Sequence, residues 1–562
     1  MKSFRRIILA FLLCTFMLAV GAGVYLYQQF SPNRTQVEAS YHELNKPVFY
    51  QGDYYTTSAI GVRESLKLPL ALIQEWMDPN IIYEKSSDSV IVTTKDKVLR
   101  MKTAELSALI NEKPISLSFP IEKKGETVYV PLEPLRQLYP FEVRESEATG
   151  AVLLFKQGDV VKWGKITSKK PVQLRTSASI KAPYIANVPP GELVMILGEE
   201  NDWVKVQQSS GPIGYVKKKE LTEDHVETIP VQESKDSYAP WKPPGKLNMT
   251  WEHVITKNPD TAKLGEMPGL QVVSPTWFSL ADEKGRINNL ADASYVKWAQ
   301  SRNYQVWALF SNGFDPDRTA KALASYDSRM NVIKQLLSFA QTYHLQGINI
   351  DFENVYLKDK DNLTQFVREL TPFMHAQGLA VSIDVTPKST NEMWSMFYDR
   401  TALSQVVDYM MLMAYDEYWA TSPKSGSVSS LPWTERSVTT LLNTEKVPSS
   451  KLVLGIPFYT RQWTEETANG KTTATSKTLT MEAAQAIIKD KKLTPVFLPD
   501  TGQNYVEYKD GNKLIRIWLE DEDSLKSRLE IVKKYDLAGI ATWRRGFEVP
   551  ATWPILQKGL QP

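Results

Sequence analysis

The sequence predicts an α/β protein whose C-terminal part folds as a (β/α)8 TIM barrel. The chain has 562 residues, of which 42% are hydrophobic, so it can bury several cores. From about residue 246 to the C-terminus, apolar β-like runs alternate with amphipathic helical segments. A long apolar run near the N-terminus stands apart from this pattern. Two smaller folded regions are therefore expected between that run and the barrel.

The N-terminal run predicts a membrane-spanning helix. Lys2, Arg5 and Arg6 precede an uninterrupted apolar stretch over residues 7–27, which is long enough to cross a bilayer. We expect residues 1–30 to be a signal-anchor segment that leaves the rest of the chain extracellular, on a single-pass protein of the cell membrane. A cleaved signal peptide and a secreted protein are the alternative, since Val20 and Ala22 could form a cleavage site. The length of the run favours retention.

Composition limits the chemistry. The 66 basic and 64 acidic residues nearly balance, so no bulk field points to nucleic acid. The only cysteine, Cys14, lies inside the apolar run, which leaves the exported part without an intrachain disulfide. The five histidines show no metal-ligand spacing, and we expect neither a metal nor a cofactor.

Residues 46–158 are expected to form a small α+β stalk domain. Short β-rich runs such as SVIVTT (89–94) and TVYVPL (127–132) are mixed with one or two helices. The segment GETVYVPLEPLRQLYPFEVR (125–144) resembles the N-terminal domain of copper amine oxidases. That resemblance implies a spacer rather than a catalytic domain, and no copper ligand set is present.

Residues 163–221 show short strands separated by turn residues. Leu174-Arg175, Pro190-Gly191-Glu192, Trp203 and Gly214-Tyr215-Val216 resemble a bacterial SH3 domain, which implies an all-β SH3-like barrel and a cell-wall peptide as its ligand. Trp203 is expected to be a core residue rather than part of a peptide site. Residues 222–245 carry charges, serine and proline without an apolar period, so they are expected to form an extended linker.

The barrel is assigned to residues 246–562. The helical periods between its strands include RMNVIKQLLSFAQTYH (329–344) and NLTQFVRELTPFMHAQG (362–378), the second capped by Gly378. A polar insertion between Thr464 and Asn504 interrupts the alternation. The strand candidates are LQVVSPTWF, YQVWALF, LQGINIDFEN, LAVSIDVTP, VVDYMMLMAYD, LVLGIPFY and LAGIATW.

One strand candidate has an apolar face and an ionisable face. In QGINIDFEN the side chains of Asn349, Asp351 and Glu353 point to one side, and three apolar side chains, those of Ile348, Ile350 and Phe352, point to the other. The apolar face suits packing on the helices, which leaves the polar groups facing into the barrel at a cost of several kcal/mol. Such a cost indicates a functional site, whereas an isolated Asp-x-Glu could equally be an acidic strand end in water.

This stretch resembles the signature of family 18 glycoside hydrolases, Asp-Gly-x-Asp-x-Asp-x-Glu at the end of the fourth strand. Here it reads Gln346-Gly347-Ile348-Asn349-Ile350-Asp351-Phe352-Glu353, which keeps the final two acids and replaces two others. Asn349 is expected to hydrogen-bond to Asp351 without holding a proton or a charge for it. Asp384, in VSIDVTP, also faces inward, and its role is left open between structural and functional.

Three later segments extend the resemblance: MMLMAYDEY, LGIPFYTR and GIATWRRG match the sixth, seventh and eighth strands of the family. The resemblance implies a proton donor, Glu353, and two residues that stabilise the intermediate, Asp351 and Tyr415. The expected substrate-binding residues are Asn349, Asp416, Tyr459, Arg461, Trp543 and Trp277.

The predicted function is hydrolysis of β-N-acetylglucosaminyl linkages in peptidoglycan, by the substrate-assisted retaining mechanism that the resemblance implies. Cleavage of chitin or chitooligosaccharides is the alternative within the same enzyme class. A glycan-binding wall protein without activity is the alternative from another class, although such relatives usually lose the terminal acid, which is present here as Glu353.

Overall fold

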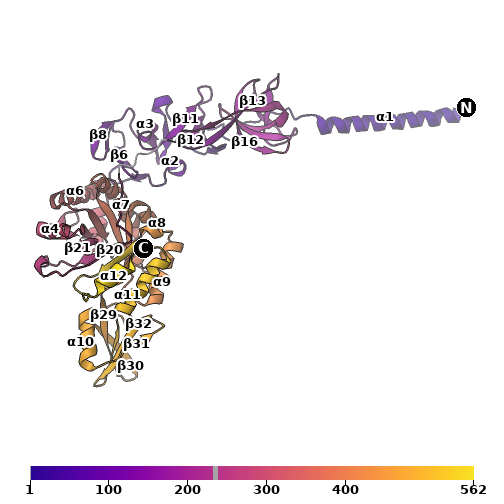
Figure 1. Ribbon diagram of the computed structural model, residues 1–562. Coiled ribbons are helices and arrows are strands. Elements are labelled where there is room, and N and C mark those ends of the chain that lie inside the picture. Colours follow the sequence, from indigo (N-terminus) through magenta and orange to yellow (C-terminus); the bar gives the residue numbers. More distant parts are fainter. Residues whose placement is uncertain (1, 232–237, 562) are drawn as a thin grey trace. The chain divides into compact units, whose positions relative to one another are not determined.

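The computed structural model describes residues 2–231 and 238–561. The chain divides into two compact units. Described residues up to 83 and from 100 to 231 belong to the first unit, whereas residues 84–99 and 238–561 belong to the second. Figure 1 shows helix α1 (Lys2–Phe30), the first element of that unit, as a single long helix.

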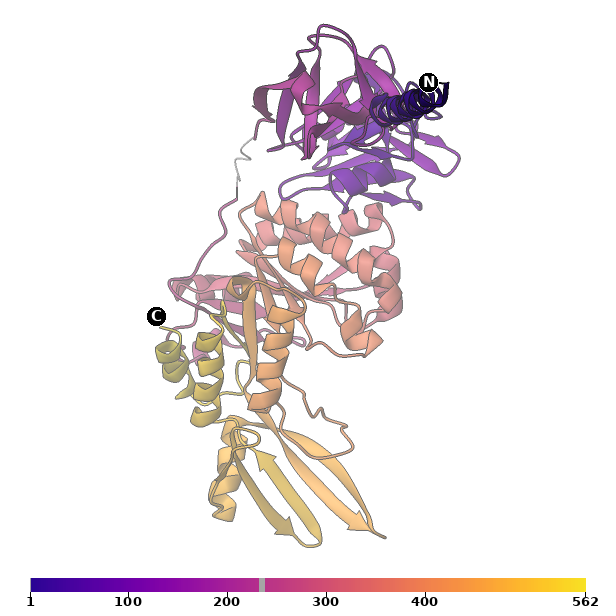
Figure 2. The same cartoon turned by 90° about the vertical axis from the view of Figure 1, so that its right-hand side faces the viewer.

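A closed ring of eight parallel strands forms the centre of the second unit, as predicted for a TIM barrel (Figures 1 and 2). The ring closes because the first strand pairs with both the second and the last, with Met249 opposite Val272 on one side and Ala541 on the other. The strands are β20 (Leu247–Glu252), β21 (Val272–Pro275), β24 (Gln305–Ser311), β25 (Gly347–Asp351), β26 (Ala380–Val385), β27 (Tyr409–Leu412), β28 (Leu452–Pro457) and β34 (Gly539–Trp543).

Helices follow most of these strands and begin at residues that cap them. Ser325 accepts a hydrogen bond from the Ser328 backbone at the start of α6, and His344 ends that helix in the left-handed region with φ of 54°. Gly378, with φ of +73°, follows the end of α7 as expected. The helices are α4 (Ala293–Ser301), α5 (Pro316–Leu323), α6 (Tyr326–Tyr343), α7 (Lys360–His375), α8 (Arg400–Val406), α9 (Leu431–Asn443), α11 (Glu522–Lys534) and α12 (Thr552–Gly559).

Two additions decorate the barrel. A short hairpin, β22 (Phe278–Leu280) and β23 (Ile287–Asn289), pairs with the end of β24. The predicted insertion after β28 is a separate antiparallel sheet with one helix, because its strands pair with one another and not with the barrel (Figure 2). Its elements are β29 (Tyr459–Ala468), β30 (Lys471–Thr480), α10 (Met481–Lys491), β31 (Val496–Leu498), β32 (Gln503–Asp510) and β33 (Lys513–Trp518).

The interior of the barrel is filled by large side chains from alternate strand positions. Trp251, Trp307, Leu309 and Met411 are among its buried members. The expected linker also packs on this cluster near its end, since Trp241 meets Trp307 edge to face with ring centroids 6.0 Å apart. Because these large side chains fill the barrel interior, polar groups can gather only at the carboxyl ends of the strands.

The stalk region of the chain is a mixture of short strands and two helices, as the sequence predicts. Val48 in β1 pairs in parallel with Val152 in β12, although about a hundred residues separate them. The elements are β1 (Val48–Tyr50), β2 (Asp53–Tyr55), β3 (Lys67–Pro69), α2 (Leu70–Trp76), β4 (Ile82–Glu84), β5 (Ser89–Thr93), β6 (Val98–Lys102), β7 (Ser107–Ile110), β8 (Lys113–Ser116), β9 (Glu122–Lys124), β10 (Thr127–Pro131), α3 (Leu132–Leu135), β11 (Phe141–Glu145) and β12 (Val152–Lys156).

The SH3-like region is all-β, with a core of aliphatic side chains such as Leu174 and Val206. The expectation that Trp203 is a core residue is wrong: it is half-buried, and Lys217 lies over its ring at 5.8 Å. Residues 221–228, taken from the expected linker and the end of the domain before it, form an edge strand of this sheet. The strands are β13 (Val160–Ile166), β14 (Val172–Arg175), β15 (Tyr184–Val188), β16 (Leu193–Glu200), β17 (Trp203–Gln208), β18 (Ile213–Lys217) and β19 (Leu221–Thr228).

The stalk and SH3-like regions share a hydrophobic cluster within the first unit. Phe49 and Phe155 from the stalk pack with Trp163 and Met195 from the SH3-like sheet. Beside this cluster, the Arg144 guanidinium makes two hydrogen bonds to the carboxylate of Glu227, at 3.1 and 2.5 Å. The two regions are therefore joined through a common core rather than through a linker.

Candidate active site

Glu353 lies just beyond the carboxyl end of β25, and its backbone is held from two sides. The Asn312 side chain donates to the Glu353 carbonyl at 2.7 Å and accepts from the Glu353 amide at 3.2 Å. The Tyr398 hydroxyl donates to the preceding carbonyl, that of Phe352, at 2.8 Å. Among the described residues, no group donates a hydrogen bond to the Glu353 carboxyl. The Glu353 backbone is therefore held in place, while its carboxyl remains available to a substrate.

The environment of Glu353 favours its protonated form. Burial, followed by the negative charges of Asp351 and Asp416, raises the pKa of Glu353 well above its ordinary value. A carboxyl that keeps its proton near neutral pH can act as a general acid toward a leaving oxygen. The role that the sequence predicts for Glu353 requires a carboxyl of this kind.

Asn349 lies fully buried beneath the acids and makes three hydrogen bonds. Its side-chain oxygen accepts from the Trp251 indole at 2.8 Å and from the Ser274 hydroxyl at 3.2 Å, and its amide donates to Asp384 at 2.8 Å. The expected hydrogen bond to Asp351 is therefore wrong, because both ends of the amide are engaged elsewhere. Asn349 acts on the site from below and has no surface with which to touch a sugar.

Asp351 is left with an unsatisfied oxygen. Its Oδ1 is buried and has no hydrogen-bond partner among the described residues. Burial raises the pKa of Asp351 to about 7, and burial together with the charge of Asp351 raises the pKa of Asp384. The three acids, which include Glu353, therefore cannot all ionise readily. A buried acceptor of this kind is suited to a donor brought by a ligand.

Four further predicted residues converge at the ends of β27 and β28. The Asp416 carboxylate accepts from the Tyr459 hydroxyl at 2.7 Å and from the Arg461 guanidinium at 2.8 Å. Tyr415 lies beside them, its ring centroid 6.3 Å from that of Tyr459. Among the described residues, the Tyr415 hydroxyl has no hydrogen-bond partner, so it is free to donate to a bound ligand. Arg461 is buried and supports Asp416 rather than reaching outward.

The structure places the two predicted tryptophans differently. Trp543, at the end of β34, is half-buried and lies at the site, with ring centroids 6.0 Å from Trp251 and 5.8 Å from His253. Trp277 is only 1% exposed, and its indole donates to Asn258 at 2.6 Å. Its ring packs against Tyr295, so it offers no free face to a substrate.

Sequence reasoning missed several residues that shape the site. Asn312, Tyr398, Trp251 and Ser274 each position a functional group. Asn312 follows the end of β24 directly, so applying the strand-end rule to every strand would have found it. An exposed aromatic pair was also missed: Phe314 and Trp394 are 52% and 42% exposed, with ring centroids 6.2 Å apart. The Asn354 side-chain amide donates to the Phe314 backbone carbonyl, and Asn354 is next to Glu353 in sequence. The aromatic pair therefore borders the site.

A parallel barrel that presents a glutamic acid with a raised pKa, buried acceptors and aromatic rings at its carboxyl end is the architecture of a glycoside hydrolase. The comparisons place it within that class. The family described as "Glycosyl hydrolases family 18" matches residues 276–548, and the barrel resembles that family over these residues. Bacterial SH3 domains match residues 170–222, and copper amine oxidase N-terminal domains match residues 51–154.

Relatives include bacterial wall-lytic proteins. The chain is 26% identical over 290 residues to the uncharacterized glycosylase YvbX of Bacillus subtilis, a match covering 50% of this chain and 81% of that protein. It is 28% identical over 234 residues to the cortical fragment-lytic enzyme of the same organism, covering 41% of this chain and 53% of that one. The spore cortex-lytic enzyme SleL of Bacillus megaterium shares the fold, with a TM-score of 0.50, 19% identity and coverage of 61% and 78%.

Replacing the proton donor should abolish most turnover. We expect Glu353→Gln to fold normally and to lose at least about a hundredfold in kcat, because a positioned general acid contributes that much or more. The measurement is release of reducing ends from a glycan substrate. Glu392→Gln, an exposed change on the same barrel, is the matched control and should keep full activity. Equal activity in the Glu353 variant would refute its role as the acid.

The charge of Asp416 should set part of the pH dependence. Glu353 acts in its protonated form, and the Asp416 charge helps to raise its pKa. In Asp416→Asn, Glu353 should ionise at lower pH, so the basic limb of the kcat/KM profile should move to lower pH.

The asparagine oxygen can still accept from Tyr459 and Arg461. Asp500→Asn, at an exposed position of the inserted sheet, should leave the profile unchanged. A basic limb that stays in place or moves upward in Asp416→Asn contradicts the charge coupling.

Proposed function

We propose that this glycoside hydrolase cleaves β-N-acetylglucosaminyl linkages of peptidoglycan outside the cell membrane. The observation that carries the proposal is the pairing of a protonated Glu353 with a buried, unpartnered acceptor on Asp351. An N-acetylated sugar brings an amide N–H that would satisfy this acceptor. A sugar without the acetamido group would leave it unpaired, at a cost of about 1–3 kcal/mol.

The proposed mechanism is substrate-assisted and retaining. Glu353 protonates the leaving glycosidic oxygen while the substrate's acetamido oxygen attacks C1 and forms an oxazolinium. Asp351 accepts the acetamido N–H and stabilises the positive charge, and Tyr415 donates to the acetamido oxygen. Glu353 then removes a proton from water. This water attacks C1, which opens the oxazolinium ring and retains the configuration.

Binding of the polymer is proposed to rest on the aromatic residues at the rim. Trp543 would lie under the sugar whose bond is cleaved. Phe314 and Trp394 offer exposed faces next to Glu353, where neighbouring sugars could stack. Asp416 and Tyr459 supply polar contacts, and the SH3-like domain is proposed to hold a peptide of the same wall.

Two features favour peptidoglycan over chitin. Relatives include enzymes described as cortical fragment-lytic. The barrel also follows an SH3-like module and a helix that could anchor the chain, and each attachment near one polymer raises the effective concentration of the enzyme there. Chitooligosaccharides remain the second candidate, because the acetamido-recognising groups serve them equally and human di-N-acetylchitobiase is 24% identical over 240 residues.

Digestion of purified peptidoglycan should release fragments with reducing N-acetylglucosamine at their ends, since the sugar whose C1 is attacked becomes the reducing end. Mass spectrometry after borohydride reduction identifies that sugar, and Glu353→Gln should release none. N-acetylmuramic acid carries a 3-O-lactyl group that adds bulk beside the acetamido pocket. Fragments ending in reducing N-acetylmuramic acid would refute the proposed linkage, and turnover of chitooligosaccharides with inert peptidoglycan would refute the wall substrate.

Helix α1 is proposed to anchor the protein with the barrel outside. The segment Phe4–Phe30 is long and apolar enough to cross a membrane. The basic residues Lys2, Arg5 and Arg6 would lie at its cytoplasmic end. Protease added to intact, wall-stripped cells should digest the chain from about residue 35 onward, while a cytoplasmic marker protein survives. Full protection would overturn the orientation, and recovery of the protein mainly from the medium would overturn the anchor.

A further inference from the structure

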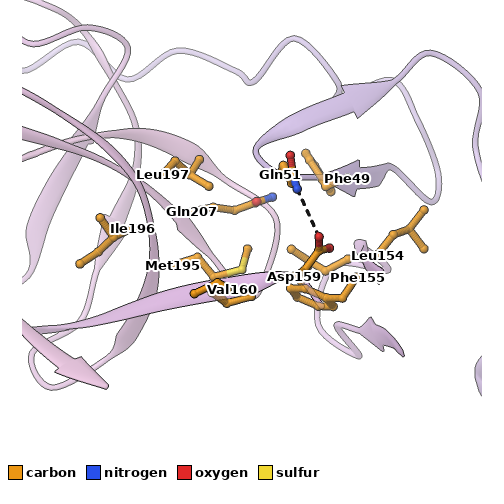
Figure 3. A pocket seen from close by; sticks show the side chains of 12 residues that line it. Phe49, Gln51, Leu154, Phe155, Asp159, Val160, Met195, Ile196, Leu197 and Gln207 are labelled. Atoms are coloured by element: carbon orange, nitrogen blue, oxygen red, sulfur yellow. Dashed lines mark hydrogen bonds between the residues drawn. The ribbon is translucent and has the colours of Figure 1, made fainter. Parts of the chain in front are cut away.

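The first unit contains a cavity between the stalk and the SH3-like sheet, far along the sequence from the acids of the barrel. Its volume is about 250 Å³, and Figure 3 shows the side chains that line it. This is slightly below the usual range of small-molecule sites, about 300–1,000 Å³, so it suits a group the size of one long side chain. Most of the wall is apolar, including Phe49, Leu153, Met195 and Leu197.

The polar part of the lining contains hydrogen-bond acceptors that lack a good donor. Gln207 is fully buried; its amide nitrogen donates to the Gly211 carbonyl at 3.2 Å, but its Oε1 has no partner among the described residues. In Figure 3 the Gln207 amide points toward Gln51 and Asp159. An unpaired buried acceptor costs free energy, and none of the residues that the structure describes supplies the missing donor.

Asp159 is the only ionisable residue among those that line the cavity. Its Oδ2 accepts from the Lys156 backbone at 2.7 Å, whereas Oδ1 receives only long contacts of 3.4 Å from the Tyr50 hydroxyl and the Gln51 amide. Among the described residues, none forms an ion pair with Asp159. The ammonium of Lys156, three residues before Asp159, lies 5.1 Å over the ring of Tyr50.

We propose that this cavity binds an aliphatic chain that ends in a primary ammonium group. The apolar wall would cover the methylene groups, while Asp159 Oδ1 and Gln207 Oε1 accept the ammonium protons. A neutral apolar ligand would leave both acceptors unpaired, and an anion would be repelled by Asp159. The side chain of a peptide and a free alkylamine share this chemistry. The proposal is independent of the catalytic assignment, because no residue of the barrel takes part.

Binding to the full chain in detergent tests the proposal. The probes are Nα-acetyl-lysine methylamide, n-butylamine and, without the ammonium, Nα-acetyl-norleucine methylamide, each measured by isothermal titration. We expect saturable binding of the lysine derivative at least about tenfold tighter than the norleucine derivative, because a hydrogen bond to a charged group contributes that much. Butylamine binding equally well assigns the site to free amines, and much weaker butylamine binding assigns it to a peptide side chain.

Three variants check the residues. Asp159→Asn keeps an acceptor for the Lys156 backbone and should weaken lysine-derivative binding about tenfold or more. Asp202→Asn, an exposed change in the same domain, should have no effect. Val160→Phe should block binding without disturbing a core, since Val160 lines the cavity but is 62% exposed.

Hydrolysis of a soluble chitooligosaccharide should be unchanged in all three variants, which separates this site from the catalytic one. Absence of saturable binding, equal binding of the norleucine derivative, or full binding by Asp159→Asn at an unchanged unfolding temperature would each overturn the proposal.

Discussion

The crowding of carboxyl groups at the end of β25 is the constraint on which the site depends. Asp351, Glu353 and Asp384 lie in an interior where each charge is poorly solvated and raises the cost of the next. No arginine or lysine among the described residues forms an ion pair with any of the three. Ionisation of all three groups is therefore disfavoured, which suits the role proposed for Glu353 as proton donor. The barrel tolerates the crowded carboxyl groups because backbone hydrogen bonds, large apolar residues and the neutral amide of Asn349 hold them in place.

The arrangement of the barrel and the identity of its acids could be predicted from the sequence, since both depend on local patterns. Strand periodicity predicted that Asn349, Asp351 and Glu353 share one face of the strand. In the structure the residues between them are buried, in keeping with that alternation. The partners of these residues could not be predicted, because they come from other strands. Asn349 bonds to Asp384 in the adjacent strand and to Trp251 across the barrel, which no pattern along one strand encodes. Trp277 shows the same limit: it was expected to bind substrate, but its indole donates to Asn258 and is buried.

The first unit shows a different limit. Composition separated a stalk from an SH3-like region, and both secondary structures agree with that division. The common core could not be predicted, because Phe49 and Phe155 reach Trp163 and Met195 only after long-range strand pairing has brought β1 beside β12. Trp203 was expected in a core that turns out to be aliphatic, and the tryptophan that is buried, Trp163, lies where the two regions meet. A tryptophan at such a junction serves two sheets at once, so its burial depends on a partner that the local sequence does not contain.

Asn349 also bears on why the site can lack an acid that the family signature contains. A protonated acid at this position could accept the same two hydrogen bonds, from Trp251 and Ser274, but an ionised one would place a charge beside Asp384 and could not donate to it. The amide accepts both bonds while neutral, and it still has a donor with which to stabilise an ionised Asp384. Because Asp384 counts among the groups whose pKa the charge of Asp351 raises, the two acids are coupled across β25 and β26, and ionisation of one favours retention of the proton by the other.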